Sequence, residues 1–76
     1  MTDQLRQHAI VTADRIFEEK RSPTYEDVDD VIADLDTEHA DFVLRGPSFA
    51  ALAELNRAVR DRLKERRDQA RAASGT

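Results

Sequence analysis

Apolar side chains recur at helical spacing along most of the chain, which predicts an all-α fold. In residues 4–21 they fall on one side of a helix, with Ala9 and Ala13 at the centre of the stripe. The pattern ends before Pro23, which disfavours helical geometry at the residue before it. No segment shows the period-two alternation of a strand. We expect a small bundle of two or three short helices plus a long C-terminal helix.

A second apolar stripe follows Thr24, which with Asp27 forms a T-x-x-D helix start signal. The register of this stripe continues without interruption as far as residue 44. The pattern is consistent with one helix over 25–44, or with two helices if Asp36 or Thr37 caps a second one. The sequence leaves both arrangements open.

Gly46 and Pro47 form the clearest boundary in the chain. Gly46 suits a left-handed position just after a helix, and Pro47 cannot continue the helical turn. Ser48 is a favourable N-cap, and the stretch 49–71 that follows contains neither glycine nor proline. This pattern predicts one long helix over 49–71.

The predicted C-terminal helix has a seam of residues at alternating spacings of three and four, the a/d pattern of a coiled coil. The seam consists of Phe49, Leu52, Asn56, Val59 and Leu63. Such a seam predicts a homodimer paired along this helix. Asn56 has two interpretations, since it either pairs with its symmetry mate and fixes the register or lies at the wet edge of a monomeric bundle.

The length and composition strengthen the expectation of a dimer. A domain of 76 residues obtains only ~3–5 kcal/mol from its core unless something else holds it together. Because the chain has no cysteine, it has no disulfide, and oligomerisation is the common remaining device. We assign residues 1–71 to a single helical domain and 72–76 to a flexible tail.

The sequence offers little catalytic or ligand-binding chemistry. Two isolated glycines cannot build a phosphate-binding loop, and neither His8 nor His39 has a second histidine at i±3 or i±4. We expect no enzymatic activity, no catalytic residue, no cofactor and no metal. No apolar stretch approaches the ~20 residues of a membrane span. We therefore expect a cytoplasmic protein without membrane contact.

Charge is divided unequally along the chain. Residues 1–45 carry twelve acids and five bases, whereas 46–76 carry four acids and seven bases. The acids concentrate between residues 26 and 41, where no base balances them locally. We predict that this helix binds a basic protein partner, the alternative being a solvated outer face. The predicted partner-binding residues are Glu26, Asp27, Asp30, Asp34, Glu38 and Asp41.

The C-terminal helix carries bases around most of its circumference, which suggests nucleic-acid binding as an alternative function. The residues of this alternative surface are Arg57, Arg60, Lys64 and Arg67. Acids interleave with these bases, so that Arg57 can pair with Asp61, and Lys64 with Asp68, within the helix. Helix stability and solubility therefore also explain this basic face.

A short motif adds to the nucleic-acid alternative. Ala13-Asp14, Ile16, Pro23-Thr24 and Val28 have the spacing A-D-x-[LI]-x6-P-T-x3-V. This spacing resembles the start of the KfrA-type plasmid DNA-binding domains, in which a helix-turn-helix precedes a long coiled coil. The resemblance covers about a fifth of the chain and implies DNA binding. The sequence departs from it at Lys20, where that family usually has glycine, and in the acids after Val28.

Together these patterns predict a small non-enzymatic regulatory or adaptor protein. It is expected to dimerise through its C-terminal helix and to bind a basic protein partner through the acidic helix at 26–41. The alternative is a helix-turn-helix DNA-binding regulator that uses the basic C-terminal helix.

Overall fold

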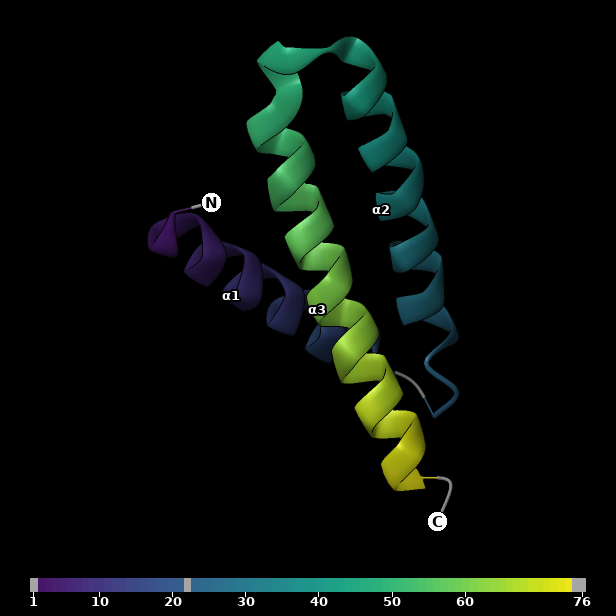
Figure 1. Cartoon of the computed structure of the whole chain (residues 1–76). Coiled ribbons are helices and arrows are strands. Elements are labelled where there is room, and N and C mark those ends of the chain that lie inside the picture. Colours follow the sequence, from purple (N-terminus) through teal and green to yellow (C-terminus); the bar gives the residue numbers. More distant parts are fainter. Residues whose placement is uncertain (1, 22, 75–76) are drawn as a thin grey trace.

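The predicted all-α fold class is confirmed. The computed structural model describes residues 2–21 and 23–74, and within these ranges there is no strand. The elements are α1 (Asp3–Lys20), α2 (Glu26–Arg45), the 3-10 turn η1 (Pro47–Phe49) and α3 (Ala50–Ser74). α2 and α3 lie side by side and antiparallel, and α1 crosses α3 obliquely (Figure 1).

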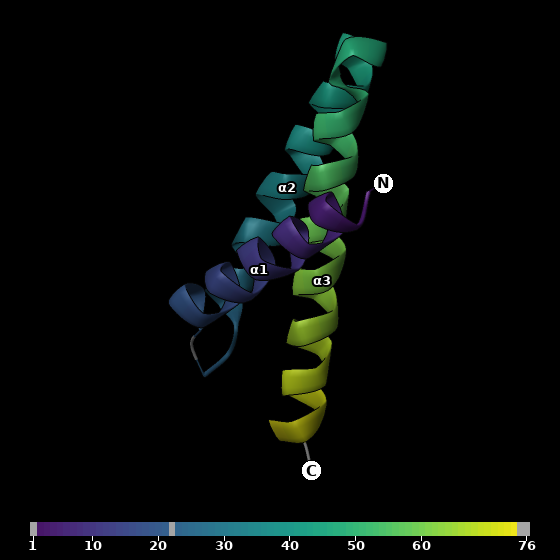
Figure 2. The same ribbon diagram turned by 90° about the vertical axis from the view of Figure 1, so that its left-hand side faces the viewer.

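α3 is the helix against which the other two pack. Both α1 and α2 contact α3 extensively, but they touch each other at few positions. α1 crosses the hairpin of α2 and α3 well below the turn that joins them (Figures 1 and 2). Near that turn the fold therefore consists of two helices without a third to cover them.

The hydrophobic core lies where the three helices meet. Its largest fully buried side chains are Val28 of α2 and Leu63 of α3. α1 contributes two alanines, whose small side chains suit close packing of helices, and Phe17. The complete core cluster is Ala9, Ala13, Phe17, Tyr25, Val28, Ile32, Val59 and Leu63.

α1 begins and ends within one residue of its predicted limits. Thr2 caps it, because its Oγ1 accepts a hydrogen bond from the backbone N–H of Leu5 at 3.2 Å. Val11, which the apolar pattern leaves off the buried stripe, is 56% exposed. The helical periodicity therefore identified the buried side of α1 correctly.

The start of α2 differs from the prediction. Tyr25 is the residue before the first helical turn, and its backbone is left-handed, with a φ of 59°. No side chain caps this end, so the predicted capping by Thr24 is wrong. The turn places the Tyr25 ring against Phe17, with ring centroids 5.7 Å apart. Burial of this aromatic pair offsets the cost of a left-handed residue other than glycine.

α2 is one continuous helix, which decides between the two arrangements that the sequence left open. Gly46 ends it with a φ of 102° and donates its N–H to the carbonyl of Val43 at 3.2 Å. Glycine thus supplies the positive φ that was expected, although its ψ of −171° is extended rather than helical. Ser48 lies inside the 3-10 turn instead of capping a helix, so its predicted role is wrong.

Three of the five predicted seam residues are buried within the chain itself. Val59 and Asn56 are 6% and 7% exposed, and Leu63 is completely buried. Val59 and Leu63 need no second chain for their burial, because both belong to the core that α1 and α2 cover. Leu52 remains 47% exposed, and Phe49 is half-buried.

α3 continues past the predicted end of the C-terminal helix at residue 71 and reaches Ser74. The first three residues of the predicted flexible tail, 72–74, are thus helical. Its last two residues, 75 and 76, lie outside the described part of the chain.

The position of Leu63 leads to a stability prediction. We expect Leu63→Ala to lower the free energy of unfolding by about 2–5 kcal/mol, because it leaves a cavity in a thin core. A loss of this size is most of the free energy of unfolding expected for so small a domain. Urea denaturation followed by circular dichroism measures the effect. Leu52→Ala is the control, with an expected loss below about 1 kcal/mol, and equal losses in the two variants would contradict the assignment of the core.

Candidate functional site

Arginines of α3 neutralise the acids on the inner side of α2. Arg67 and Arg71 both bind the carboxylate of Asp29, with N···O distances of 3.1 and 2.6 Å. Arg60 binds Asp36 at 2.8 Å, and its own pKa is raised by this hydrogen bond. The bases that were missing from the acidic segment are thus supplied by the neighbouring helix.

The other side of α3 binds α1 in the same way. Asp14 accepts hydrogen bonds from Arg62 at 3.1 Å and from Arg66 at 3.0 Å. Arg66 also reaches Glu18 at 3.3 Å, and its guanidinium lies 4.5 Å from the centre of the Phe17 ring. The arginines of α3 therefore hold α1 on one side and α2 on the other.

These ion pairs shift the titration of two carboxyl groups. The hydrogen bond from Arg71, opposed by partial burial and reinforced by Arg67, holds the pKa of Asp29 below its ordinary value of 3.8. Burial raises the pKa of Asp14, but hydrogen bonds from Arg62 and Arg66 outweigh it and leave this pKa below 3.8 as well. Both groups favour the folded state in their charged form.

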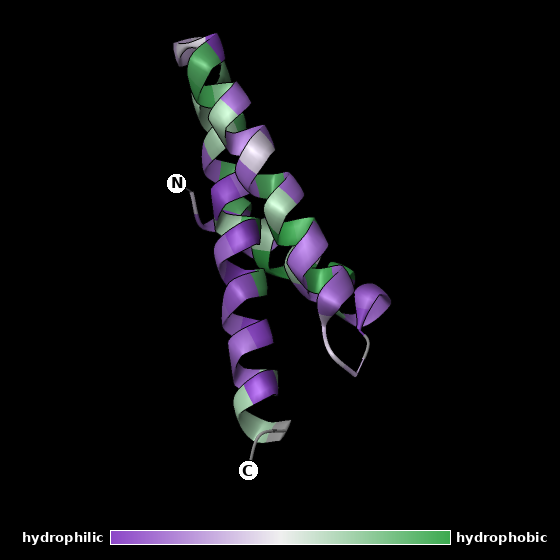
Figure 3. Cartoon of the chain, turned by 90° about the vertical axis from the view of Figure 1, so that its right-hand side faces the viewer, coloured by the Kyte–Doolittle hydropathy of each residue, from purple (hydrophilic) through white to green (hydrophobic). Residues whose placement is uncertain are grey.

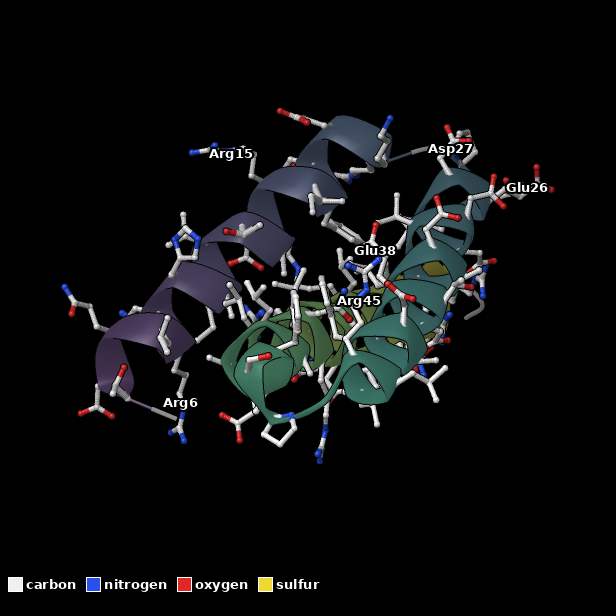
Figure 4. The ribbon with its side chains drawn as sticks, turned by 90° about the horizontal axis from the view of Figure 1, so that it is seen from above. Arg6, Arg15, Glu26, Asp27, Glu38 and Arg45 are labelled. Carbon is white, nitrogen blue, oxygen red and sulfur yellow. The ribbon has the colours of Figure 1, made fainter. Side chains whose placement is uncertain are left out.

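Four carboxylates on the outer side of α2 have no arginine partner on α3. They are all exposed, and no ion pair joins them to any described residue. Figure 4 shows two of them, Glu26 and Asp27, at the outer edge of α2 and pointing away from the other helices. We call this set the acidic ridge: Glu26, Asp27, Asp30 and Asp34.

The two remaining residues of the predicted partner surface have contacts inside the molecule. Glu38 accepts a hydrogen bond from the amide of Asn56 at 3.2 Å. Asp41 pairs with Arg45, one turn further along α2, at 2.9 Å. The structure therefore narrows the free acidic surface to the first half of α2.

Asn56 and His39 are polar residues between α2 and α3. Nδ1 of His39 lies within hydrogen-bond distance, 3.0 Å, of the carbonyl oxygen of Ala53. The side chain of Asn56 binds Glu38 through its nitrogen, but its oxygen Oδ1 is buried and has no hydrogen-bond partner among the described residues. Both residues therefore join the two helices of the hairpin.

The residues of the alternative nucleic-acid surface are not equally available. Arg60 and Arg67 bind acids of α2 and have side chains only 20% exposed. Arg57 is exposed and lies 3.8 Å from Asp61, as its spacing predicted. Asp68 pairs with Arg67, and between residues 23 and 74 no ion pair joins it to Lys64. The helix thus offers fewer free bases than its sequence suggests.

The turn between α2 and α3 exposes large apolar side chains that the sequence analysis did not single out. Leu44 is 85% exposed and Val43 is 59% exposed. Val43 also lines a surface cavity of about 370 Å³, together with Phe42, Gly46, Pro47, Ala50 and Ala53. Figure 3 shows hydrophobic residues near this turn, whereas the C-terminal half of α3 is mostly hydrophilic until its last turn. The sequence signal was the scarcity of charge between residues 40 and 53.

The described residues contain no group of three or more histidine, cysteine or acidic side chains placed to hold a metal ion. None of their helices is both long and apolar enough to cross a membrane. Comparisons with protein-family models, with curated proteins and with solved structures found no match.

The lowered pKa values predict how stability depends on pH. A carboxyl group with a depressed pKa in the folded state stabilises the protein above its unfolded pKa, and the contribution disappears as the pH falls through the folded value. We therefore expect the urea midpoint to fall between about pH 5 and pH 2. Asp29→Asn should lower the midpoint at neutral pH and reduce this fall. Asp34→Asn, which removes an unpaired carboxylate, should keep the wild-type fall, and identical profiles for both variants would contradict the role of Asp29.

The unpaired oxygen of Asn56 predicts opposite effects for two substitutions. Asn56→Leu should raise the free energy of unfolding by about 1 kcal/mol, because it removes a buried polar atom that has no partner. Asn56→Asp should lower it, because it places a second carboxylate beside Glu38 in a buried position. Thermal unfolding of both variants tests this pair, and a destabilised Asn56→Leu variant would contradict it.

Proposed function

We propose that this chain is a small non-enzymatic regulatory or adaptor protein that binds a basic protein partner through the acidic ridge. The observation that carries the proposal is the separation of the acids of α2 into two sets. Asp29 and Asp36, on the inner side, are neutralised by arginines of α3. The ridge carboxylates stay free, so their charge is available to a cation from outside.

The position of the ridge supports a binding role beyond helix stability. Glu26 and Asp27 lie in the first turn of α2, where the helix dipole favours acids. Asp30 and Asp34 lie beyond that turn, and their i,i+4 spacing costs about 0.2–0.5 kcal/mol of repulsion. A basic partner would relieve this repulsion on binding.

The charge pattern supports a protein partner better than DNA. A phosphate backbone would be repelled by the ridge, and Arg60 and Arg67 would have to leave their acids on α2 before they could bind it. A lysine- or arginine-rich segment of a protein could bind the acidic ridge without breaking any of these ion pairs. The helix-turn-helix alternative is therefore the weaker of the two proposals.

The binding test uses a fluorescein-labelled peptide rich in lysine and arginine as the probe. We expect salt-sensitive binding to the wild-type chain, measured by fluorescence anisotropy, and a loss of at least about tenfold in affinity when Asp27, Asp30 and Asp34 are all changed to Asn. The fold should remain intact, because these side chains are exposed.

The matched control changes the net charge by the same amount at other sites. Asp3→Asn, Glu19→Gln and Glu54→Gln remove three exposed acids outside α2, and this variant should bind the peptide almost as well as the wild type. Equal losses of affinity in the two triple variants would mean that the peptide responds to the net charge of the chain and not to the acidic ridge. Tighter binding to labelled random duplex DNA than to the peptide would favour the alternative function.

A further inference from the structure

Another surface cavity lies where the end of α1, the start of α2 and the C-terminal half of α3 meet. Its volume is about 270 Å³. Because a cavity of about 150 Å³ is enough to hold one benzene molecule, this cavity has room for a benzene ring with a substituent. The residues that line it are Phe17, Arg21, Tyr25, Arg66, Gln69 and Ala70.

The polar groups around this cavity are rich in hydrogen-bond donors. Arg21 and Arg66 each supply a guanidinium, which carries five N–H donors and no acceptor. Gln69 adds an amide, and Tyr25 adds a hydroxyl. No carboxylate lines the cavity, although sixteen of the 76 residues are acids. Such a lining suits a ligand group that accepts hydrogen bonds and carries negative charge.

Three of these four polar side chains have donors that the chain itself does not use. Arg21 lies 3.6 Å from Glu18, which is beyond hydrogen-bond distance. Gln69 and the Tyr25 hydroxyl make no hydrogen bond to any described residue. Within the described part, Asn56 Oδ1 is the buried side-chain atom that lacks a partner. The Tyr25 hydroxyl is therefore not sealed inside the core, and it reaches the cavity that Tyr25 lines.

Packing alone does not account for the side chain of Tyr25. Its ring stacks on Phe17, and a phenylalanine would provide the same ring. Its backbone has a φ of 59°, and residues held in such strained conformations are concentrated at binding and active sites. The hydroxyl is thus the part of Tyr25 that a ligand would explain.

The acids near the cavity limit the charge of its ligand. Asp14 and Glu18 lie 3.0 and 3.3 Å from Arg66, so they offset part of the positive charge of the two arginines. The chain as a whole carries a net charge of −4. A dianion such as phosphate would be repelled by this field, whereas a single carboxylate can bind a guanidinium through both of its oxygens.

The walls of the cavity favour a flat ligand. The Phe17 ring contacts the Tyr25 ring, with centroids 5.7 Å apart, and the Arg66 guanidinium, which lies 4.5 Å from the Phe17 centroid. These three planar groups all line the cavity. An aromatic ring packs well against such surfaces.

We propose that this cavity binds a small aromatic carboxylate. The carboxylate accepts hydrogen bonds from Arg21 and from the Tyr25 hydroxyl, and the ring of the ligand lies against Phe17 and Ala70. The site shares no residue with the acidic ridge, so it does not depend on the function proposed above.

Benzoate is the probe for this site, and the measurement is a titration of the isotope-labelled full chain followed by NMR chemical shifts. We expect saturable shifts around the cavity, with a dissociation constant of roughly 1–10 mM because so small a ligand makes few contacts. Tyr25→Phe and Arg21→Gln should each raise this constant by at least about threefold. Tyr25→Phe keeps the ring that stacks on Phe17, so its thermal unfolding midpoint should stay close to that of the wild type.

Two controls separate this site from general charge and from binding of any ring. Arg15→Gln removes an arginine of α1 that points away from α2 and α3 (Figure 4), and this variant should keep the wild-type constant. Benzamide has the same ring but no charge, and it should bind at least about tenfold more weakly.

Four results would overturn the proposal. They are the absence of saturable shifts with benzoate, equal binding of benzamide, equal weakening by Arg15→Gln, and tighter binding of inorganic phosphate than of benzoate.

Discussion

The arginines of α3 determine how the other two helices are placed. Arg62 and Arg66 bind Asp14 of α1, while Arg67 and Arg71 bind Asp29 of α2. Each such pair at a partly exposed position contributes only about 0–1 kcal/mol. In a domain whose core supplies ~3–5 kcal/mol, several of them together are a substantial share. Because α1 and α2 make few contacts with each other, their relative position depends on the contacts that each of them makes with α3.

This use of the arginines explains the charge that remains on the surface. The acids that face α3 are neutralised by its arginines, and most of the bases of α3 form ion pairs with these acids. The acids on the outer side of α2 have no such counterpart, so part of the negative charge behind the net value of −4 lies where no base of the chain neutralises it. A distribution of this kind separates the charges that hold the helices together from those that can bind another molecule.

The sequence predicted the helices well because helical periodicity and the Gly46-Pro47 break are local signals. Their caps were harder to predict. Thr24 and Ser48 have suitable side chains, but the packing of Tyr25 on Phe17 and the 3-10 turn at Pro47 decided how the backbone enters α2 and α3. The acidic helix was also identified, but which of its acids would be neutralised depended on contacts across more than twenty positions, such as Arg67 with Asp29 and Arg60 with Asp36. No local pattern contains that information.

The seam shows why an apolar repeat does not by itself specify a partner. Asn56, Val59 and Leu63 of the repeat are buried, but a second chain and the remaining helices of the same chain bury such a side equally well. Here α1 and α2 cover Val59 and Leu63, whereas the most exposed large apolar side chains, Leu44 and Val43, lie next to the turn between α2 and α3, which α1 does not reach (Figure 1).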